Sequence, residues 1–188
     1  MPSGRLILAS ASPRRARILE SLGLKFVVRP SDIDESALRE ETPHVLVQRL
    51  ARGKALVAKR QPHDCVLAAD TVVVLGSRIL GKPKNPAEAR SMLRSLSGRT
   101  HTVATGVAVS LGTRIYVALD LTDVKFRRID AAEISRYVRT GEPMDKAGAY
   151  HIEGGGAAFI EAIHGSPSNV AGLSVTTARR LLKRVGWV

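Results

Sequence analysis

The run CVLAADTVVVL at residues 65–75 restricts the fold more than any other part of the chain. A long apolar stretch rich in valine and followed by Gly76–Ser77 is typical of a β-strand that ends in a turn. Residues 78–83 then return from it. Asp70 interrupts the run, and an ionised carboxylate buried there without a partner would cost several kcal/mol. Asp70 must therefore pair with a cation, bind a metal ion, or lie at a strand end that faces a cleft.

Strands and helices alternate along the rest of the chain, but not in a strict βαβ order. Further strands are expected at 5–10, 25–29, 101–110 and 114–129, and a Gly-rich, then strand-like segment at 147–165. Helices are expected at 13–22, 43–60, 86–97, 130–140 and 174–185. This mixture, in a chain of 188 residues with 44% apolar residues, predicts one α/β domain over residues 1–188 with a mixed sheet.

The charge balance indicates an anionic partner. The net charge is +12, which suits partners from nucleic acid down to a single nucleotide. Aromatic residues make up only 4% of the chain and no zinc-finger spacing occurs, so a nucleic-acid-binding module is the weaker alternative and no specific nucleic acid is expected. No run is long enough to span a membrane. The apolar N-terminal stretch is too short for a signal peptide, and Cys65 is the only cysteine, so a cytoplasmic protein is expected.

Two adjacent arginines stand where the first helix should begin. Ser12 is a suitable N-cap, Pro13 suits the first helical position, and Gly23 suits a C-cap. Arg14 and Arg15 therefore fall in the first turn, where free N–H groups already favour negative charge. Either both guanidinium groups point to water, or an anion such as a phosphate shares this turn with them.

Two lysines also occupy unusual positions. Lys54 falls on the helix face that Val47, Leu50 and Val57 mark as inward. It either extends its ammonium to the surface or meets a phosphate or carboxylate in a cleft. Lys82 follows a strand and lies between a glycine and a proline, which favours a fixed position.

The remaining polar residues match no standard metal or nucleotide motif. The acidic stretch SDIDES lacks the EF-hand spacing, and the Gly-rich segment has neither a P-loop nor a Rossmann order. What remains is a few carboxylates, several cations at element ends, and no Cys or His constellation. Such a set suits phosphoanhydride chemistry, in which carboxylates hold Mg²⁺ or Mn²⁺, cations neutralise phosphate charge, and one carboxylate orients water.

Nine stretches together resemble the Maf, or septum-formation-inhibitor-like, nucleoside triphosphate pyrophosphatases along nearly the whole chain. They are LILASASPRRARILESLG, DIDES, VQRLARGKA, AADTVVV, ILGKP, AEARSMLRSLSGRTHTV, TDVKFR, GEPMDKAGAYHIEG and GSPSNVAGL. The resemblance implies an α/β fold with a central mixed sheet, flanking helices and two lobes around a cleft, related to inosine triphosphate pyrophosphatases. It implies hydrolysis of a nucleoside triphosphate to the monophosphate and pyrophosphate with a divalent metal ion. Homodimers are common in that family.

The resemblance also implies which residues form the site. Asp70 matches the proposed proton acceptor and Glu35 a charged position of the cleft, and we expect both to lie beside the metal ion. The positions that match the phosphate-binding turn and the other cationic site residues are Ser10, Arg14, Arg15, Lys54 and Lys82. Thr71 and Glu153, together with Arg14, match positions linked to substrate choice.

The substrate-choice positions give a mixed pattern. The branch that acts on dTTP and UTP has SPRR, ADT and a glutamine in YxIQG, whereas the branch that acts on 7-methyl-GTP has an aromatic residue, SDQ and a glutamate. This chain has Arg14 and Thr71 of the first branch but Glu153 of the second. An ionised glutamate only accepts hydrogen bonds, whereas glutamine also donates. Two positions against one favour dTTP and UTP, including modified pyrimidine nucleotides, in nucleotide-pool house-cleaning. The alternative is 7-methyl-GTP or another modified purine triphosphate.

Overall fold

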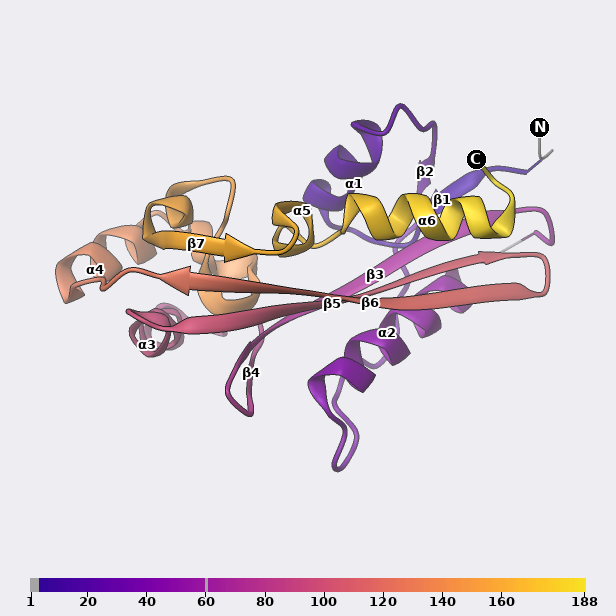
Figure 1. The fold of residues 1–188 in the computed structure, drawn as a ribbon. Coiled ribbons are helices and arrows are strands. Elements are labelled where there is room, and N and C mark those ends of the chain that lie inside the picture. The colour runs from indigo at the N-terminus through magenta and orange to yellow at the C-terminus, as the bar shows by residue number, and fades with distance from the viewer. Residues whose placement is uncertain (1–3, 60) are drawn as a thin grey trace. The chain divides into compact units, whose positions relative to one another are not determined.

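The computed structural model describes residues 4–59 and 61–188 (Figure 1). The chain divides into two compact units. Unit 1 comprises Met1–Asp70, Thr105–Asp120 and Gly172–Val188, and unit 2 comprises Thr71–Ala104 and Leu121–Ala171. The structure does not test the prediction of one domain over residues 1–188 or the cleft that the resemblance implies, and both stay predictions.

Seven strands in the described residues form one sheet in the order β2-β1-β3-β5-β6-β7, with β4 paired to β3. Their bounds are β1 Leu6–Leu8, β2 Val27–Val28, β3 Cys65–Leu75, β4 Arg78–Leu80, β5 Thr100–Leu111, β6 Arg114–Phe126 and β7 Ile160–His164. Strand β1 runs parallel to β2 and β3, whereas β4 runs antiparallel to β3 and β7 runs antiparallel to β6. The prediction of a mixed sheet is therefore confirmed.

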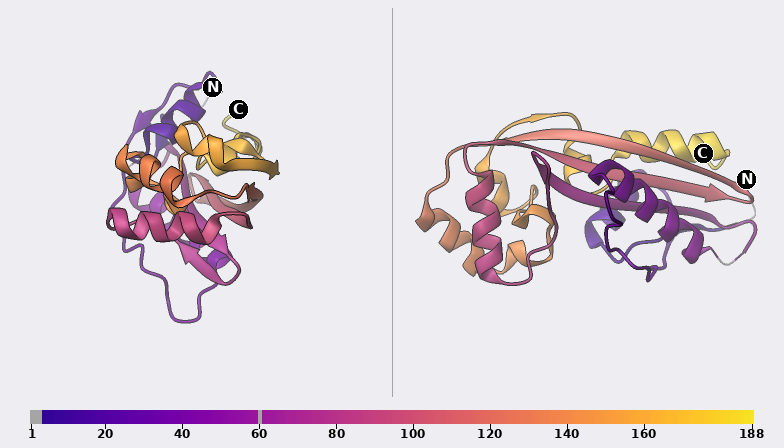
Figure 2. Two further views of the ribbon diagram at one scale, coloured as in Figure 1. Left: turned by 90° about the vertical axis from the view of Figure 1, so that its left-hand side faces the viewer. Right: turned by 90° about the horizontal axis from the view of Figure 1, so that it is seen from below.

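The helices begin largely where the local sequence predicts them (Figures 1 and 2). Thr42, Asn85 and Asp130 each accept a hydrogen bond from a backbone N–H of the first turn that follows, and Asp130 forms a full capping box. The helices are α1 Pro13–Glu20, α2 Pro43–Ala58, α3 Pro86–Leu96, α4 Ala131–Arg139, α5 Pro167–Val170 and α6 Val175–Val185, and the 3₁₀ turns are η1 Glu142–Asp145, η2 Ala147–Ala149 and η3 Gly155–Phe159. Among the described residues, no helix has the length and apolar character needed to cross a membrane.

Unit 1 buries small side chains between α2 and the sheet. Ala51 and Ala55 on α2 pack with Val66 and Ala68 on β3 in one apolar cluster. Gly106 on β5 lies directly beneath α2, where a Cβ would come within 2.2 Å of a helix carbonyl oxygen. Because these residues are small, α2 can lie close to the strands.

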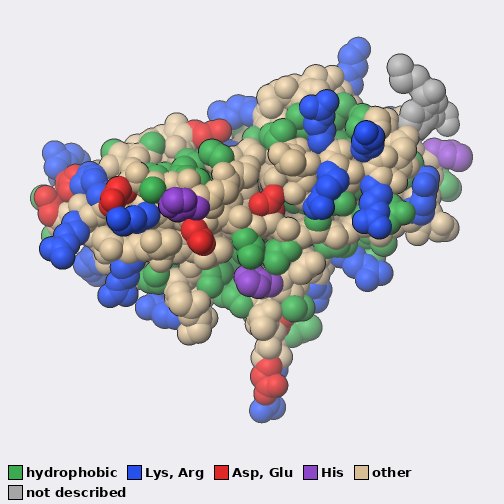
Figure 3. All heavy atoms as spheres, viewed as in Figure 1, with side chains coloured by type: hydrophobic (Ala, Val, Ile, Leu, Met, Phe, Trp, Pro, Cys, Tyr) green, Lys and Arg blue, Asp and Glu red, His purple; other side chains and the backbone are tan. Residues whose placement is uncertain are grey.

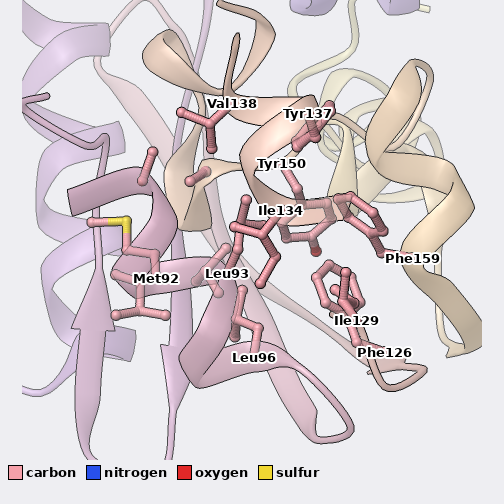
Figure 4. Packing of buried hydrophobic residues seen from close by; sticks show 14 of the residues in the cluster. Met92, Leu93, Leu96, Phe126, Ile129, Ile134, Tyr137, Val138, Tyr150 and Phe159 are labelled. Carbon is pink, nitrogen blue, oxygen red and sulfur yellow. The ribbon is translucent and has the colours of Figure 1, made fainter. Parts of the chain in front are cut away.

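Unit 2 has a larger core that is rich in aromatic residues (Figure 4). Leu93 on α3 and Ile134 on α4 are fully buried against it. The ring of Phe126 meets those of Tyr150 and Phe159 at centroid distances of 4.9 and 6.1 Å, in edge-to-face geometry. This core supports the loops that follow α4.

Several expected details of the secondary structure are wrong. Ser12 precedes α1, but its side chain makes no capping bond, and the helix ends at Glu20 with Ser21 rather than Gly23 as its C-cap. Helix α2 ends at Ala58; residue 60 lies outside the described residues. Val57 is 50% exposed and not on the inward face. The expectation of a Gly-rich and then strand-like segment at 147–165 is confirmed, because two 3₁₀ turns precede the strand β7 there.

Candidate active site

Asp70 and Lys54 form a buried ion pair in unit 1. Asp70 lies on β3 and Lys54 on α2, and Lys54 Nζ donates to Asp70 Oδ1 at 2.6 Å. Their side chains are only 10% and 9% exposed. Each of these two side chains violates the apolar pattern around it, and each is the other's charge partner. Of the three alternatives for Asp70, the structure shows the one in which it pairs with a cation.

Glu35 meets the same lysine from the side open to solvent. Its Oε1 lies 2.5 Å from Lys54 Nζ, and its side chain is 59% exposed. One ammonium group is therefore shared by a buried carboxylate and an accessible one. A ligand that approaches from solvent reaches Glu35 first.

The turn before α1 is built around Ser10 and Arg15. Ser10 Oγ accepts from the backbone N–H of Ser12 at 3.2 Å and from Arg15 Nη1 at 3.1 Å. Arg15 Nε donates to the carbonyl of Gly172 at 2.8 Å. The idea that both guanidinium groups point to water is therefore wrong for Arg15, because the protein holds it in place. Arg14 beside it is half-buried.

The charges of this region act on one another. Burial lowers the pKa of Arg15 below its usual value, the negative charge of Asp70 opposes that shift, and the neighbouring Arg14 adds to it. Glu35 acts in the same direction as Asp70. Arg15 thus lies in the field of both carboxylates, and the site holds cations from two elements around a buried acid.

Two carboxylates can supply only part of the coordination shell of a metal ion. The remaining ligands would come from substrate and water. Within the described residues, no group of three or more His, Cys, Asp or Glu side chains is arranged to hold a metal by itself. Glu35 and Asp70 lie on either side of the Lys54 ammonium, which is the cation between them here, so a metal ion would have to bind beside Lys54. Mg²⁺ is commonly held by one or two carboxylates and completed by substrate phosphates and water. The donor set therefore fits a hard divalent ion that arrives with a phosphate.

The other residues expected at the site belong to unit 2. Thr71 follows Asp70 on β3 and is half-buried. Lys82 is exposed two residues after β4. Glu153 is exposed in the loop before η3, and its Oε2 lies 3.7 Å from His151 Nε2. That these residues join Asp70 in one site stays a prediction.

Sequence reasoning missed the residue that orders the Glu153 loop. Glu142 Oε1 accepts from the hydroxyl of Tyr137 at 2.6 Å, and its Oε2 accepts from the backbone N–H of Gly155 at 3.2 Å. A Cβ on Gly154 would lie 2.6 Å from that carboxylate. The run EGGG is the signal that was available, because glycines allow backbone to wrap closely around a side chain.

Comparisons with known proteins agree with this picture. Residues 5–185 match the family model described as Maf-like protein. A dTTP/UTP pyrophosphatase from Anaeromyxobacter dehalogenans is 50% identical, covering 97% of this chain and 95% of that protein. One from Myxococcus xanthus is 48% identical, covering 96% and 92%. A solved HAM1 protein from Coxiella burnetii shares the fold, with a TM-score of 0.50 and 21% identity over 67% of this chain and 74% of that one. The expected α/β fold is thereby confirmed, and this chain belongs to the Maf family.

Proposed function

We propose that this protein hydrolyses the α–β phosphoanhydride of a nucleoside triphosphate and releases the monophosphate and pyrophosphate. The observation that carries the proposal is the buried Asp70–Lys54 pair with Glu35 on its solvent side. Because the desolvation of both ions offsets their attraction, a buried pair such as Asp70–Lys54 adds little net stability, and ionisable groups buried in this way concentrate at functional sites. Relatives about half identical over nearly their full length are called dTTP/UTP pyrophosphatases, and dTTP and UTP are the substrates we propose here.

Asp70 is the proposed general base. Its carboxylate would accept the proton of the attacking water, and Lys54 keeps that carboxylate in one orientation through the 2.6 Å contact. Glu35 and Asp70 would hold Mg²⁺ or Mn²⁺, which when bound would draw charge from the phosphate oxygens. The metal and its identity are part of the proposal.

The cations have a separate task. Arg14, Arg15 and Lys54 would offset the charge of the triphosphate and of the leaving pyrophosphate, and Ser10 fixes Arg15. Lys82 would add a further positive charge from unit 2. Removing Lys54 or Lys82 should therefore weaken both affinity and turnover, because both act before and during the reaction.

Product analysis tests the reaction. With Mg²⁺ or Mn²⁺ the purified protein should release pyrophosphate rather than orthophosphate, and ¹⁸O from water should appear in the monophosphate. Asp70→Asn keeps the size of the side chain and should lower kcat by about a hundredfold or more. Asp64→Asn is the matched control, since Asp64 is also buried and pairs with Arg29 in the same unit. A normal kcat in Asp70→Asn would refute the role of Asp70.

A panel of nucleotides tests the substrate. UTP and dTTP should be preferred over CTP, GTP and 7-methyl-GTP, and Glu153→Gln should keep or sharpen that preference. Strong 7-methyl-GTP activity that disappears in Glu153→Gln would favour the modified-purine alternative and leave the reaction itself standing. Glu153 carries that alternative because an ionised carboxylate pairs best with a base edge rich in donors.

The basic surface supports only a weaker second function. Lys and Arg side chains are spread over the face shown in Figure 3, with fewer Asp and Glu among them. We propose a cytoplasmic enzyme that meets nucleotides rather than specific nucleic acid, in a homodimer of the kind common in its family. Tight, sequence-selective binding of nucleic acid at physiological salt would show that a second function exists.

A further inference from the structure

Glu35 lies on a long loop that needs an anchor. Residues 31–42, here called the acidic loop, connect β2 to α2 without a helix or strand of their own. Fixing the backbone of each residue costs about 1–2 kcal/mol of conformational entropy. A largely exposed Glu35 on such a loop would not meet Lys54 reliably unless other contacts hold the loop.

Helix α2 supplies those contacts along one side. The methyl end of Ile33 packs over Gly53, where a Cβ would come within 3.2 Å of Ile33 Cδ1. Lys54 meets Glu35 one residue further along the helix. Arg49, one helical turn before Gly53, reaches the other end of the acidic loop. The acidic loop therefore rests on α2 at three successive points.

Arg49 makes the most extensive of these contacts. Its Nε and Nη2 donate to the two carboxylate oxygens of Glu41 at 2.7 and 2.8 Å, and Nη2 also donates to the carbonyl of Ser36 at 2.9 Å. The Glu41 side chain is only 4% exposed and accepts a further bond from the backbone N–H of Leu38 at 3.0 Å. Arg49 thus holds Ser36 and Glu41, and the residues between them, together through its guanidinium group.

Glu41 and Arg49 stay charged at neutral pH and well into the acidic range. The hydrogen bonds from Arg49 lower the pKa of Glu41 to about 2, with help from the Leu38 N–H. Both carboxylate oxygens of Glu41 accept hydrogen bonds from the protein, so we assign Glu41 a structural role in the acidic loop. Ser36, the residue next to Glu35, is the point where Arg49 fixes the backbone closest to the site.

We propose that Arg49 is a positioning residue, which clamps the acidic loop onto α2 so that Glu35 meets Lys54 on the open side of Asp70. Its effect on catalysis rests on the proposed function, whereas the clamp itself does not. Only arginine offers the planar fork that binds both Glu41 oxygens and a carbonyl together, so lysine is not an equivalent replacement.

Kinetics of paired variants test the catalytic part. Arg49→Lys should lower kcat, or raise the Mg²⁺ concentration needed for half-maximal rate, by roughly 10- to 100-fold, the usual effect of losing a residue that orients a metal ligand. In a Glu35→Gln background the same change should cost less than about twofold, because Arg49 acts through Glu35. Arg52→Lys, at an exposed position on the same helix, is the control that should leave the rates unchanged.

Two outcomes would overturn the positioning role. If Arg49→Lys costs the same factor with and without Glu35, Arg49 acts on the substrate or the fold directly. If Arg49→Lys leaves both kcat and the Mg²⁺ dependence unchanged, the clamp has no effect on the site. Glu41→Gln removes the charge from the other side of the clamp. It should reproduce the Arg49→Lys result even if that variant folds poorly.

Hydrogen exchange tests the clamp without nucleotide. The backbone N–H groups of Leu38 and Glu41, which bond within the acidic loop, should exchange faster in Arg49→Lys than in the unchanged protein. Exchange that stays the same would refute the clamp. If Arg49→Lys shows this faster exchange but the unchanged protein itself hydrolyses no nucleotide, the proposed function is refuted and the clamp is left intact.

Discussion

Replacing Lys54 with methionine should destabilise the protein much more than replacing Lys54 and Asp70 together. Methionine keeps most of the buried stem but removes the ammonium that lies 2.6 Å from Asp70. The carboxylate of Asp70 is then left buried without its main partner. Glu35, by contrast, is largely exposed and can turn to water. The cost therefore falls on Asp70.

The size of the effect follows from two opposing terms. At 2.6 Å, opposite unit charges attract by roughly 6 kcal/mol for an effective dielectric constant of about 20. Burying each ion costs several kcal/mol, so the intact pair adds little net stability. Removing one partner from a buried pair typically costs about 3–5 kcal/mol. We expect about 3 kcal/mol for Lys54→Met, because Arg15 remains close enough to attract Asp70.

Urea unfolding of four proteins measures this directly. The set is the unchanged protein, Lys54→Met, Asp70→Asn and the double variant. We expect the double variant to recover most of the stability that Lys54→Met loses, and to remain inactive although it is folded. A loss below about 1 kcal/mol in Lys54→Met, or a double variant as unstable as the sum of the two single changes, would refute the argument.

Three further predictions concern unit 2. Gly154→Ala places a Cβ 2.6 Å from the Glu142 carboxylate, so it should lower Tm more than Gly81→Ala, whose Cβ would meet nothing within 4 Å. Burial lowers the pKa of His101 to about 4, although the negative charge of Asp123 acts to raise it. Between about pH 6.5 and pH 4 the unfolded chain therefore binds a proton at this histidine that the folded protein does not bind. Stability should fall as the pH drops from about 6.5 to 4, and His101→Gln should remove that window in a pH series of Tm; an NMR titration of His101 with a midpoint near 6.5 would contradict it. Phe126→Ala empties the centre of the aromatic core and should cost about 3–5 kcal/mol in urea unfolding, whereas a cost below 1 kcal/mol would mean that the core is not packed as described.

The elements that the sequence predicts best are those with purely local signals. Asn85 and Asp130 cap the helices that follow them, because each cap needs only a side chain and an N–H three residues away. Ser12 looks like the same signal and does not cap. Its own N–H is bonded by Ser10, whose hydroxyl is also fixed by Arg15. The local signal fails in a turn that is also bonded to a distant part of the chain, because Arg15 in the first turn of α1 donates to the carbonyl of Gly172.

The sequence singles out Lys54 and Asp70 one by one, but it does not show that they form a pair. Lys54 and Asp70 both break the apolar pattern of their elements, and that pattern shows that each needs a partner. It does not show that each is the partner of the other, because the two are 16 residues apart and on different elements. Arg49 and Glu142 interrupt no apolar pattern, and charged residues at ordinary surface positions are common. Their roles depend on which loop each one contacts.

The position of α2 joins the apolar core to the chemistry of the site. Lys54 reaches Asp70 only because α2 lies close to the sheet, and Gly106 permits this by leaving no side chain beneath the helix carbonyl. The same helix places Arg49 and Gly53 where they hold the acidic loop. A larger residue at position 106 would force α2 away from β5, which would disturb the buried ion pair and the loop together. A change in the apolar core, far from any charge, is therefore expected to act on the site through the helix.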